Sequence, residues 1–422
     1  LWLTVHVPEA AAPGPYEGSF VLKEKDGAGL VKVPIRLEVL PVKLISPPGV
    51  QFYLMFTAAY SQGARYGVRK PGMAAKALGL YRELKDHGMT CIVPKCSDWP
   101  YKPGQFVGLE ACVATAMKAG LNGPVVWYMS SLVNGVKGGA KYKNYDGKCD
   151  NWNEQRDLAN LKAIVQEVQK RAKAKGWPEI IYMTVDEPGT QTEDRQIRSL
   201  RMGTILPKTL KVVHDLGARG CTTISEPTDD KHNRQWVKEP DELRGMWDLS
   251  RPYCGIRIYG YGYPQGKTSL AAEKADCKKR GHEMWWYYNS AVMGKDRYAA
   301  RMYYGLWSWK VGARGVGSWT YPGGRSVQFE LVREGIDDFK YLATLEALIA
   351  AKRGPEAERI FAQVFLDRLK ASIELDKDGY VRDWAKAARA VTAAAAPVGS
   401  KGRADFAALK RRLADLIKSL AR

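Results

Sequence analysis

The chain has 422 residues, of which 45% are hydrophobic and 10% aromatic, and its formal net charge is +20. This composition excludes a disordered chain, and the length predicts two or three domains. The absence of any run of about 18 apolar residues excludes a membrane-spanning helix. No signal peptide is recognisable, and the sequence begins with Leu1 partway through a strand pattern. We therefore expect that a natural N-terminus, with any targeting signal, precedes it.

The positive charge raises nucleic acid and acidic polymers as partners. Lys and Arg are spread widely, however, without a basic block or zinc-finger spacing, so we expect a solvated basic surface and no nucleic-acid partner. The seven Cys form no CxxC pair, which favours buried free thiols and leaves a disulfide open. The five His lack the paired spacing of a metal site, and we expect no metal and no cofactor.

Residues 1–46 are predicted to be the C-terminal part of a β-sandwich. Alternating apolar and polar residues with turn signals between them indicate three antiparallel strands, at 1–7, 16–22 and 31–40. A Pro-Pro-Gly linker then leads out of this domain.

Residues 50–350 show short apolar strands that alternate with helices. We expect eight strands, at 52–56, 90–94, 125–129, 180–186, 220–225, 253–259, 282–289 and 315–321. Helices are expected at 74–88, 107–119, 153–175, 191–203, 205–216, 268–280 and 296–310. This is the pattern of a (β/α)8 TIM barrel, which typically takes about 250 residues. A doubly wound open sheet competes, but no glycine fingerprint follows the first strand, as a nucleotide-binding version requires.

Residues 351–422 are predicted to be a C-terminal helical extension. Leu409, Leu413, Leu416, Ile417 and Leu420 recur at helical spacing, which is typical of a helix that packs against a core. Helical packing is a plainer account of this region than a DNA-binding tail.

The active site of a TIM barrel lies at the carboxyl ends of its strands. The fourth strand ends in Asp186 and Glu187, and Pro188-Gly189 stops it there. Two adjacent carboxylates at the end of a buried strand are costly unless they have a purpose. The structural alternative is that Asp186 caps the following turn and that Glu187 pairs with an arginine.

Aromatic and polar side chains from other strands are expected at the same rim. They are Trp127, Tyr128, Tyr259, Trp285, Tyr287, Asn289, Trp319 and Tyr321. Each ring taken alone is explained equally well by core packing. Rings from several strands around two acids favour a sugar, whose C–H faces stack on aromatic rings while its hydroxyls bind acids and amides.

Glycoside cleavage needs an acid for the leaving oxygen and a group that stabilises the oxocarbenium-like carbon. Adjacent residues of one extended strand point in divergent directions, so Asp186 and Glu187 cannot readily flank the bond as nucleophile and acid. They suit another division, in which Glu187 is the general acid and Asp186 holds the N–H of a substrate 2-acetamido group. The amide oxygen of the substrate then attacks the anomeric carbon.

Three stretches carry a family resemblance. The strand end Thr184-Val185-Asp186-Glu187-Pro188 resembles that of glycoside hydrolase family 123, the β-N-acetylgalactosaminidases, and of related glycoside-hydrolase-like catalytic domains. Arg333-Glu334-Gly335-Ile336-Asp337-Asp338 resembles the signature that follows their barrel, and Trp285-Trp286-Tyr287 resembles an element of their seventh strand. The N-terminal strands resemble the tail of their β-sandwich.

The resemblance implies a retaining, exo-acting β-N-acetylgalactosaminidase that works through an oxazolinium intermediate, with Glu187 as general acid/base and Asp186 orienting the acetamido group. It also implies a tyrosine on the acetamide, for which Tyr287 is the first choice and Tyr259 the second. Tyr53 and Lys95, at the ends of the first two strands, are weaker candidates. The implied partner is a glycan with a terminal 2-acetamido sugar, and the family suggests a secreted or periplasmic protein.

The acids of the 333–338 signature are interpreted as structural residues at a helix start, where the macrodipole favours them. Three other functions stay open. One is a retaining glycosidase with a separate carboxylate nucleophile, for example Glu226. The others are a non-catalytic carbohydrate-binding protein on a barrel scaffold and a nucleic-acid-binding protein. The natural glycan, the choice between galactosamine and glucosamine, and the oligomeric state also stay open.

Overall fold

The computed structural model describes residues 3, 5–8, 10–25, 27, 29–41, 43–55, 71–94, 107–129, 152–188, 201–224, 240–262, 270–319, 326–396 and 405–421. They fall into two compact units. The larger comprises residues 49–336 and 375–384, and the smaller comprises residues 1–48, 337–374 and 385–422.

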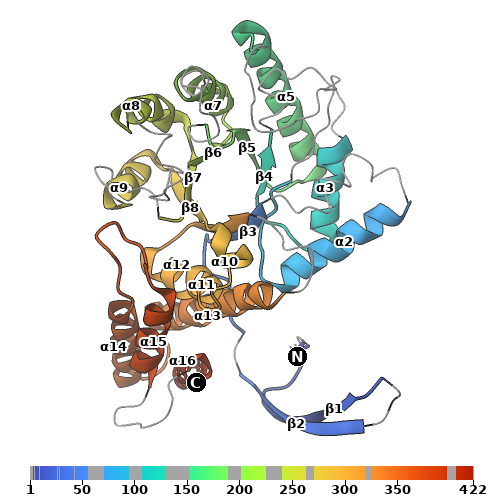
Figure 1. Ribbon diagram of the computed structural model, residues 1–422, viewed down its shortest axis with the longest axis vertical. Helices are drawn as coiled ribbons and strands as arrows, with labels where there is room; N and C mark the ends of the chain where they lie inside the picture. Colours follow the sequence, from blue (N-terminus) through green and yellow to red (C-terminus); the bar gives the residue numbers. More distant parts are fainter. Residues whose placement is uncertain are drawn as a thin grey trace. The chain divides into compact units, whose positions relative to one another are not determined.

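The larger unit is built on a curled sheet of seven parallel strands with helices around it (Figure 1). In their order across the sheet the strands are β3 (Gln51–Met55), β9 (Gly315–Trp319), β8 (Glu283–Tyr287), β7 (Ile256–Gly260), β6 (Gly220–Ile224), β5 (Ile180–Val185) and β4 (Val125–Tyr128). From β4 to β9 each strand pairs with the next one in the chain, which is what repeated strand–helix units produce.

The helices and helical turns of this unit follow the strands in the chain. They are α2 (Pro71–Asp86), α3 (Val107–Lys118), α5 (Glu154–Lys175), η1 (Arg201–Ile205), α7 (Leu206–Asp215), α8 (Pro240–Ser250), η2 (Arg251–Tyr253), α9 (Leu270–Arg280), α10 (Asn289–Met293), α11 (Ala299–Met302), η3 (Tyr303–Trp307) and α12 (Ser308–Val311). In α5 the Asn153 side chain caps the first turn by accepting from the Arg156 N–H at 2.9 Å. The same helix ends at Gly176, whose φ of 60° a glycine adopts without steric cost.

The two edges of the sheet meet at residues 92 and 93. Val93 forms a parallel bridge with Met55 of β3, and Ile92 forms one with Val125 of β4. The predicted strand 90–94 is thus a two-residue link between the edges. The predicted α/β class with alternating strands and helices is confirmed, whereas the described residues show seven strands and not a full eight-stranded barrel.

Alternate residues of successive strands fill the interior of the curled sheet. These buried residues are Tyr53, Met55, Cys91, Val93, Val126, Tyr128, Ile181, Met183, Cys221, Ile256, Ile258, Trp285 and Tyr287. Two glycines of β9 make room for the largest rings. A Cβ on Gly315 would lie 2.1 Å from the Trp285 ring, and one on Gly317 would lie 2.2 Å from the Tyr53 ring. The Gly-Val-Gly spacing of β9 is therefore a packing requirement.

The smaller unit contains the N-terminal sheet and most of the C-terminal helices. β1 (Gly14–Lys23) and β2 (Gly29–Val39) pair antiparallel. No strand is found at residues 3 and 5–8, so two of the three predicted strands are present and a sandwich is not shown. The helices are the later part of α13 (Val327–Ala350), α14 (Glu356–Ser372), α15 (Trp384–Ala395), of which Trp384 belongs to the larger unit, and α16 (Phe406–Ala421). They confirm the predicted helical C-terminus, and the apolar face predicted for the last helix is buried.

The placement predicted for the acids of the 333–338 signature is wrong. Because α13 begins at Val327, Glu334 and Asp338 lie in its third and fourth turns and not at its start. Glu334 is 3.4 Å from Arg301, and Asp338, which is fully buried, is 3.9 Å from Lys410. Ion pairs rather than the macrodipole stabilise them.

Two general properties concern only the part of the chain that the structure describes. No helix there is long and apolar enough to cross a membrane. Five cysteines of that part are free and buried, namely Cys91, Cys112, Cys221, Cys254 and Cys277.

Candidate active site

Asp186 and Glu187 follow the last residue of β5, and one hydroxyl of the neighbouring strand β6 contacts both. The Thr223 hydroxyl donates to Asp186 Oδ1 and accepts from the Glu187 N–H at 2.8 Å. Thr223 and Asp186 are buried, with exposed fractions of 1% and 6%. Because a hydroxyl offers one donor and two acceptor sites, Thr223 can fix the Asp186 carboxylate against the backbone of the next residue.

The backbone departs from a regular strand at this point. The pairing of β5 with β6 shifts register between Met183 and Val185, and Glu187 has a φ of 39°. A left-handed conformation costs a residue with a side chain about 1–2 kcal/mol, and it persists where the surroundings fix it. The extended geometry that we assumed for both acids is therefore wrong for Glu187, which does not continue the strand alternation.

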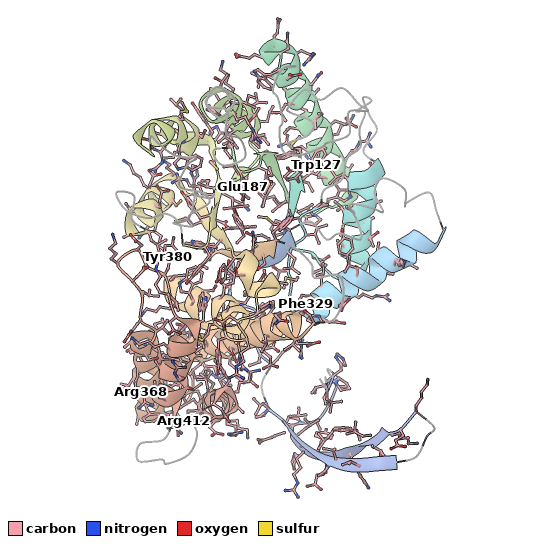
Figure 2. All side chains as sticks on the ribbon, viewed as in Figure 1. Trp127, Glu187, Phe329, Arg368, Tyr380 and Arg412 are labelled. Atoms are coloured by element: carbon pink, nitrogen blue, oxygen red, sulfur yellow. The ribbon has the colours of Figure 1, made fainter. Side chains whose placement is uncertain are left out.

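Tyr287, the last residue of β8, reaches Glu187 from the opposite part of the sheet. Its hydroxyl donates to Glu187 Oε1, and the ring is 6% exposed. Glu187, which Figure 2 labels, is partly buried. The structure thus brings together the two predicted acids and the tyrosine that was the first choice for the substrate acetamide.

Two residues near the acids were missed by the sequence analysis. Besides Thr223, the buried Arg201 at the start of η1 donates to the Asp186 carbonyl oxygen at 3.3 Å. The sequence did contain a signal for Thr223. It lies two residues after Cys221 and so faces the same interior, and it is a polar residue near the carboxyl end of its strand. Arg201 had no comparable signal, since it belongs to a helical turn.

Trp319 and Asn289 lie at the carboxyl ends of neighbouring strands. The backbone N–H of Trp319 donates to Asn289 Oδ1 at 3.3 Å, and Trp319 is 40% exposed. An indole exposed to this degree presents a flat apolar surface to solvent at the end of β9.

Three of the predicted aromatic residues are buried in the interior of the curled sheet. Tyr53 and Trp285 are fully buried with their ring centroids 5.4 Å apart, and Tyr53 donates to the Trp286 carbonyl at 2.9 Å. Burial keeps the pKa of Tyr53 well above its usual range, so it stays neutral. Tyr128 is 6% exposed on the same interior face.

Trp127 lies on the other face of the sheet. Its neighbours Val126 and Tyr128 point to the interior, so Trp127 points outward, where its ring lies 6.2 Å from that of Tyr182 on β5 (Figure 2). The structure does not bring Trp127 to the two acids.

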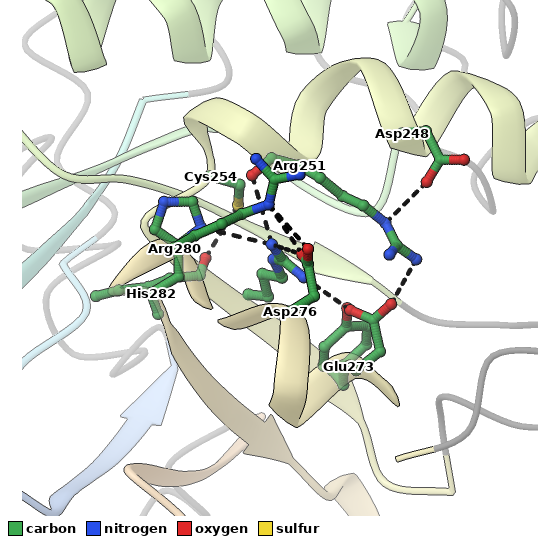
Figure 3. A network of polar contacts seen from close by, with 10 residues as sticks. Asp248, Arg251, Cys254, Glu273, Asp276, Arg280 and His282 are labelled. Atoms are coloured by element: carbon green, nitrogen blue, oxygen red, sulfur yellow. Dashed lines mark hydrogen bonds and ion pairs between the residues drawn. The ribbon is translucent and has the colours of Figure 1, made fainter. Parts of the chain in front are cut away.

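Tyr259 also points outward, because its hydroxyl contacts Glu273 of α9. Glu273 belongs to a buried polar network with Arg251 and Asp276 (Figure 3). The Tyr259 hydroxyl donates to Glu273 Oε2 at 2.6 Å, and the fully buried Arg257 contacts the same oxygen at 2.9 Å. Arg257 also pairs with Asp276 at 2.6 Å. At the edge of this network, burial and the charges of Arg257 and Arg280 lower the pKa of His282 to about 4. Tyr259, the second choice for the acetamide, is therefore separated from the acids by the sheet.

Lys95, Tyr321 and Glu226 lie outside the described residues. Within the described part of the chain, no group of three or more His, Cys, Asp and Glu side chains is placed to hold a metal ion.

Comparisons with known proteins give structural similarity only. No family model and no curated protein matches the sequence. Among solved structures, a family 123 glycoside hydrolase from Clostridium perfringens, studied for glycolipid glycan hydrolysis, aligns over 99% of this chain and 79% of its own, with a TM-score of 0.59 and 10% identity. The family 123 resemblance drawn from the sequence is thus confirmed at the level of the fold.

Two more distant structures are a β-1,4-mannanase from the sea hare Aplysia kurodai and a GH39 enzyme from Xanthomonas axonopodis pv. citri. The first covers 68% of this chain and 91% of its own, with 14% identity and a TM-score of 0.40. The second covers 72% and 68%, with 12% identity and a TM-score of 0.42. Likenesses this distant say nothing specific about this chain.

Proposed function

We propose that the chain is a glycoside hydrolase that removes a terminal 2-acetamido sugar, most closely of the β-N-acetylgalactosaminidase kind. The observation that carries the proposal is the convergence of Asp186, Glu187 and Tyr287 on one end of the sheet, with Thr223 holding the two acids. The fold shared with a family 123 glycoside hydrolase supports it.

In the proposed reaction Glu187, as a carboxylic acid, protonates the glycosidic oxygen while the bond from that oxygen to the anomeric carbon breaks. The carbonyl oxygen of the substrate acetamide attacks the same carbon and forms an oxazolinium ion. Asp186 accepts the acetamide N–H and stabilises the positive charge that develops on the ring. Glu187, now a carboxylate, takes a proton from the water that opens the ring, so the configuration is retained.

Tyr287 would be shared between the acid and the substrate. Its hydroxyl donates to Glu187 Oε1 in the structure, and on substrate binding it would turn to the acetamide oxygen. Trp319, partly exposed at the end of β9, would support the apolar face of the sugar, with Asn289 beside it. Tyr128, Tyr53 and Trp285 would form the packed floor beneath.

The proposal extends to the scaffold. We propose that residues 90–94 act as the eighth strand of a closed barrel with domain limits 50–350, since residues 92 and 93 already bridge both edges. Residues 1–46 would belong to a β-sandwich, and residues 351–422 would form the helical extension.

The test is hydrolysis of nitrophenyl β-N-acetylgalactosaminide, β-N-acetylglucosaminide and β-galactoside by the full chain. We expect turnover of an acetamido substrate, none of the plain galactoside, inhibition by a thiazoline analogue, and a loss of about 10²–10⁴-fold in kcat for Glu187→Gln. Turnover of plain hexosides with a trappable covalent adduct, abolished by Glu226→Ala, would favour a separate nucleophile instead. Tight glycan binding without hydrolysis, unchanged by Glu187→Gln, would identify a binding protein.

A further inference from the structure

A segment from the C-terminal region lies at the carboxyl ends of β7 and β8. Residues Leu375–Trp384 follow α14 and reach the first residue of α15, yet they belong to the larger unit together with the sheet. Among their partners are Tyr261 and Tyr288, the first residues after β7 and β8. The Tyr261 hydroxyl donates to the Val381 carbonyl at 3.0 Å and accepts from the Val381 N–H at 2.8 Å. One hydroxyl therefore binds both polar groups of the Val381 backbone.

Aromatic rings also hold the Tyr261 side chain in place. Its ring centroid lies 4.6–5.6 Å from those of Tyr288, Tyr303, Trp307, Tyr380 and Trp384. Two of these rings belong to the 375–384 segment, and one of the two, Tyr380, is labelled in Figure 2 and is 1% exposed. Rings at such distances attract one another in addition to the apolar area that they bury. The side chain of Tyr261 is thus fixed by ring packing as well as by its hydroxyl.

The 375–384 segment has a defined shape of its own, which depends on Asp376. Oδ1 of this residue accepts from the backbone N–H groups of Asp378 and Tyr380, each at 2.9 Å, and Oδ2 accepts from Arg382. The Asp376 N–H donates to the Tyr380 carbonyl at 2.9 Å. An Asp side chain that binds the backbone a few residues ahead stabilises a tight turn. The segment therefore presents Val381 to Tyr261 from an ordered turn.

The backbone of Tyr261 connects this packing to the candidate active site. Its N–H donates to the Tyr287 carbonyl at 2.8 Å, and the Tyr287 hydroxyl donates to Glu187 Oε1. The hydroxyl of a tyrosine lies at the far end of the ring, so a small tilt of the backbone displaces it considerably. Misplacement of a group at an active site lowers the rate even when the cause lies away from the reacting atoms. The end of β8 must therefore be held firmly if Tyr287 is to meet a substrate.

We propose that the 375–384 segment is a positioning element of the active site, which fixes Tyr287 through Tyr261. The proposal rests on the proposed glycosidase function, since it gives Tyr287 the same task at the substrate acetamide. Tyr261 and the segment act through Tyr287 and are not themselves catalytic residues. The C-terminal region then contributes to activity and not to stability alone.

The kinetic test is a double-mutant cycle on the full chain, with nitrophenyl β-N-acetylgalactosaminide as substrate. Tyr261→Phe keeps the ring and removes the hydroxyl that binds Val381, and Tyr287→Phe removes the hydroxyl that meets Glu187. We expect Tyr261→Phe to lower kcat by about three- to tenfold and to leave KM nearly unchanged. In the Tyr287→Phe background the same substitution should change kcat little, because residues that act through one group are not additive.

Tyr259→Phe is the matched control for the kinetic test. Tyr259 lies on β7, two residues before Tyr261, but its hydroxyl donates to Glu273 on the outward side of the sheet. Removing this hydroxyl should lower the midpoint of thermal unfolding and leave kcat unchanged.

A second experiment examines the segment without any substrate. Asp376→Ala removes the bonds that shape the turn, whereas Asp376→Asn keeps Oδ1 as an acceptor and loses only the charge opposite Arg382, whose side chain is largely exposed. Hydrogen exchange followed by mass spectrometry reports the protection of the Tyr261 amide, which binds the Tyr287 carbonyl. We expect faster exchange in Asp376→Ala and parent-like exchange in Asp376→Asn, with kcat in the same order. Peptides from β4 should exchange as in the parent, which separates local loosening from global unfolding.

Three results would each overturn the proposal: parent kcat in Tyr261→Phe, additive losses in the double-mutant cycle, or unchanged exchange of the Tyr261 amide in Asp376→Ala. If Tyr261→Phe fails to fold, the two Asp376 variants decide the outcome. A parent chain that hydrolyses no glycoside refutes the proposed function instead, and the exchange experiment alone then decides whether the segment holds the end of β8.

Discussion

Thr223→Val should disable the site without unfolding the protein. Valine keeps the shape of threonine but removes the hydroxyl that donates to Asp186 Oδ1 and accepts from the Glu187 N–H. A hydrogen bond to a charged group contributes about 1.5–3 kcal/mol. If Asp186 needs that bond to hold its position in the transition state, kcat should fall by about 10- to 150-fold, because each 1.36 kcal/mol is a factor of ten.

The adjacent residue provides a matched control. Thr222 is equally buried on the same strand, but its hydroxyl donates to the Val185 backbone carbonyl at 2.7 Å and touches neither acid. Thr222→Val should therefore cost stability, about 0.5–1.5 kcal/mol, with little change in kcat. Thr223→Ser keeps the hydroxyl and should retain most of the activity.

The assay is steady-state hydrolysis of the acetamido nitrophenyl substrate for the three variants, with urea unfolding alongside. The reasoning is refuted if Thr223→Val keeps the kcat of the parent, or if Thr222→Val loses as much activity as Thr223→Val. Equal losses in Thr223→Ser and Thr223→Val would mean that packing of the methyl group, and not the hydroxyl, matters at this position.

Three further predictions concern stability. Gly317→Ala should destabilise the sheet by about 1–3 kcal/mol in urea unfolding, because its Cβ would lie 2.2 Å from the Tyr53 ring. The control is Gly79→Ala in α2, where a Cβ meets nothing within 4 Å, and this variant should be about 0.5–1 kcal/mol more stable. Glu273→Gln should cost about 3–5 kcal/mol, since it breaks a buried ion pair with the fully buried Arg257; an unchanged midpoint would contradict this. The pKa of His282 is lowered to about 4 in the folded state. Between about pH 6.5 and 4 the unfolded chain therefore binds one proton more than the folded chain at this residue. The free energy of unfolding consequently falls as the pH falls through that window. The melting temperature of His282→Gln should therefore fall less over this window than that of the parent.

The strands and the order of the fold were predictable because their signals are local. Short apolar runs predicted β4 to β9 to within three residues at either end, and apolar periodicity predicted a helix at 153–175, where α5 lies. The helix α8 was missed, although Leu243, Met246 and Trp247 recur in its sequence at helical spacing. The 90–94 run is apolar like a strand, but its pairing depends on two edges that come from distant parts of the sequence.

The side of the sheet on which each aromatic residue lies was harder to predict. Period-two alternation is reliable within a strand, yet its phase relative to the interior must be known. Tyr287 and Tyr259 look alike in sequence, each near the end of an apolar strand, but Tyr287 has the phase of the interior and Tyr259 that of the helices. Aromatic residues at the exposed strand ends and aromatic residues in the buried interior are of the same types. Only their exposure, which the sequence does not give, distinguishes Trp319 from Trp285.

The two adjacent acids illustrate how sequence and structure combine at the site. In a regular strand, neighbours point to opposite faces, so an Asp-Glu pair would place one acid inside and one outside. Here the register shift in β5 and the left-handed φ of Glu187 break that alternation, and Thr223 and Tyr287 hold the result from two other strands. The strained backbone at Glu187 opposes this arrangement. It therefore depends on residues far apart in sequence, and a change at Thr223 would remove the convergence while the Asp-Glu motif stayed intact.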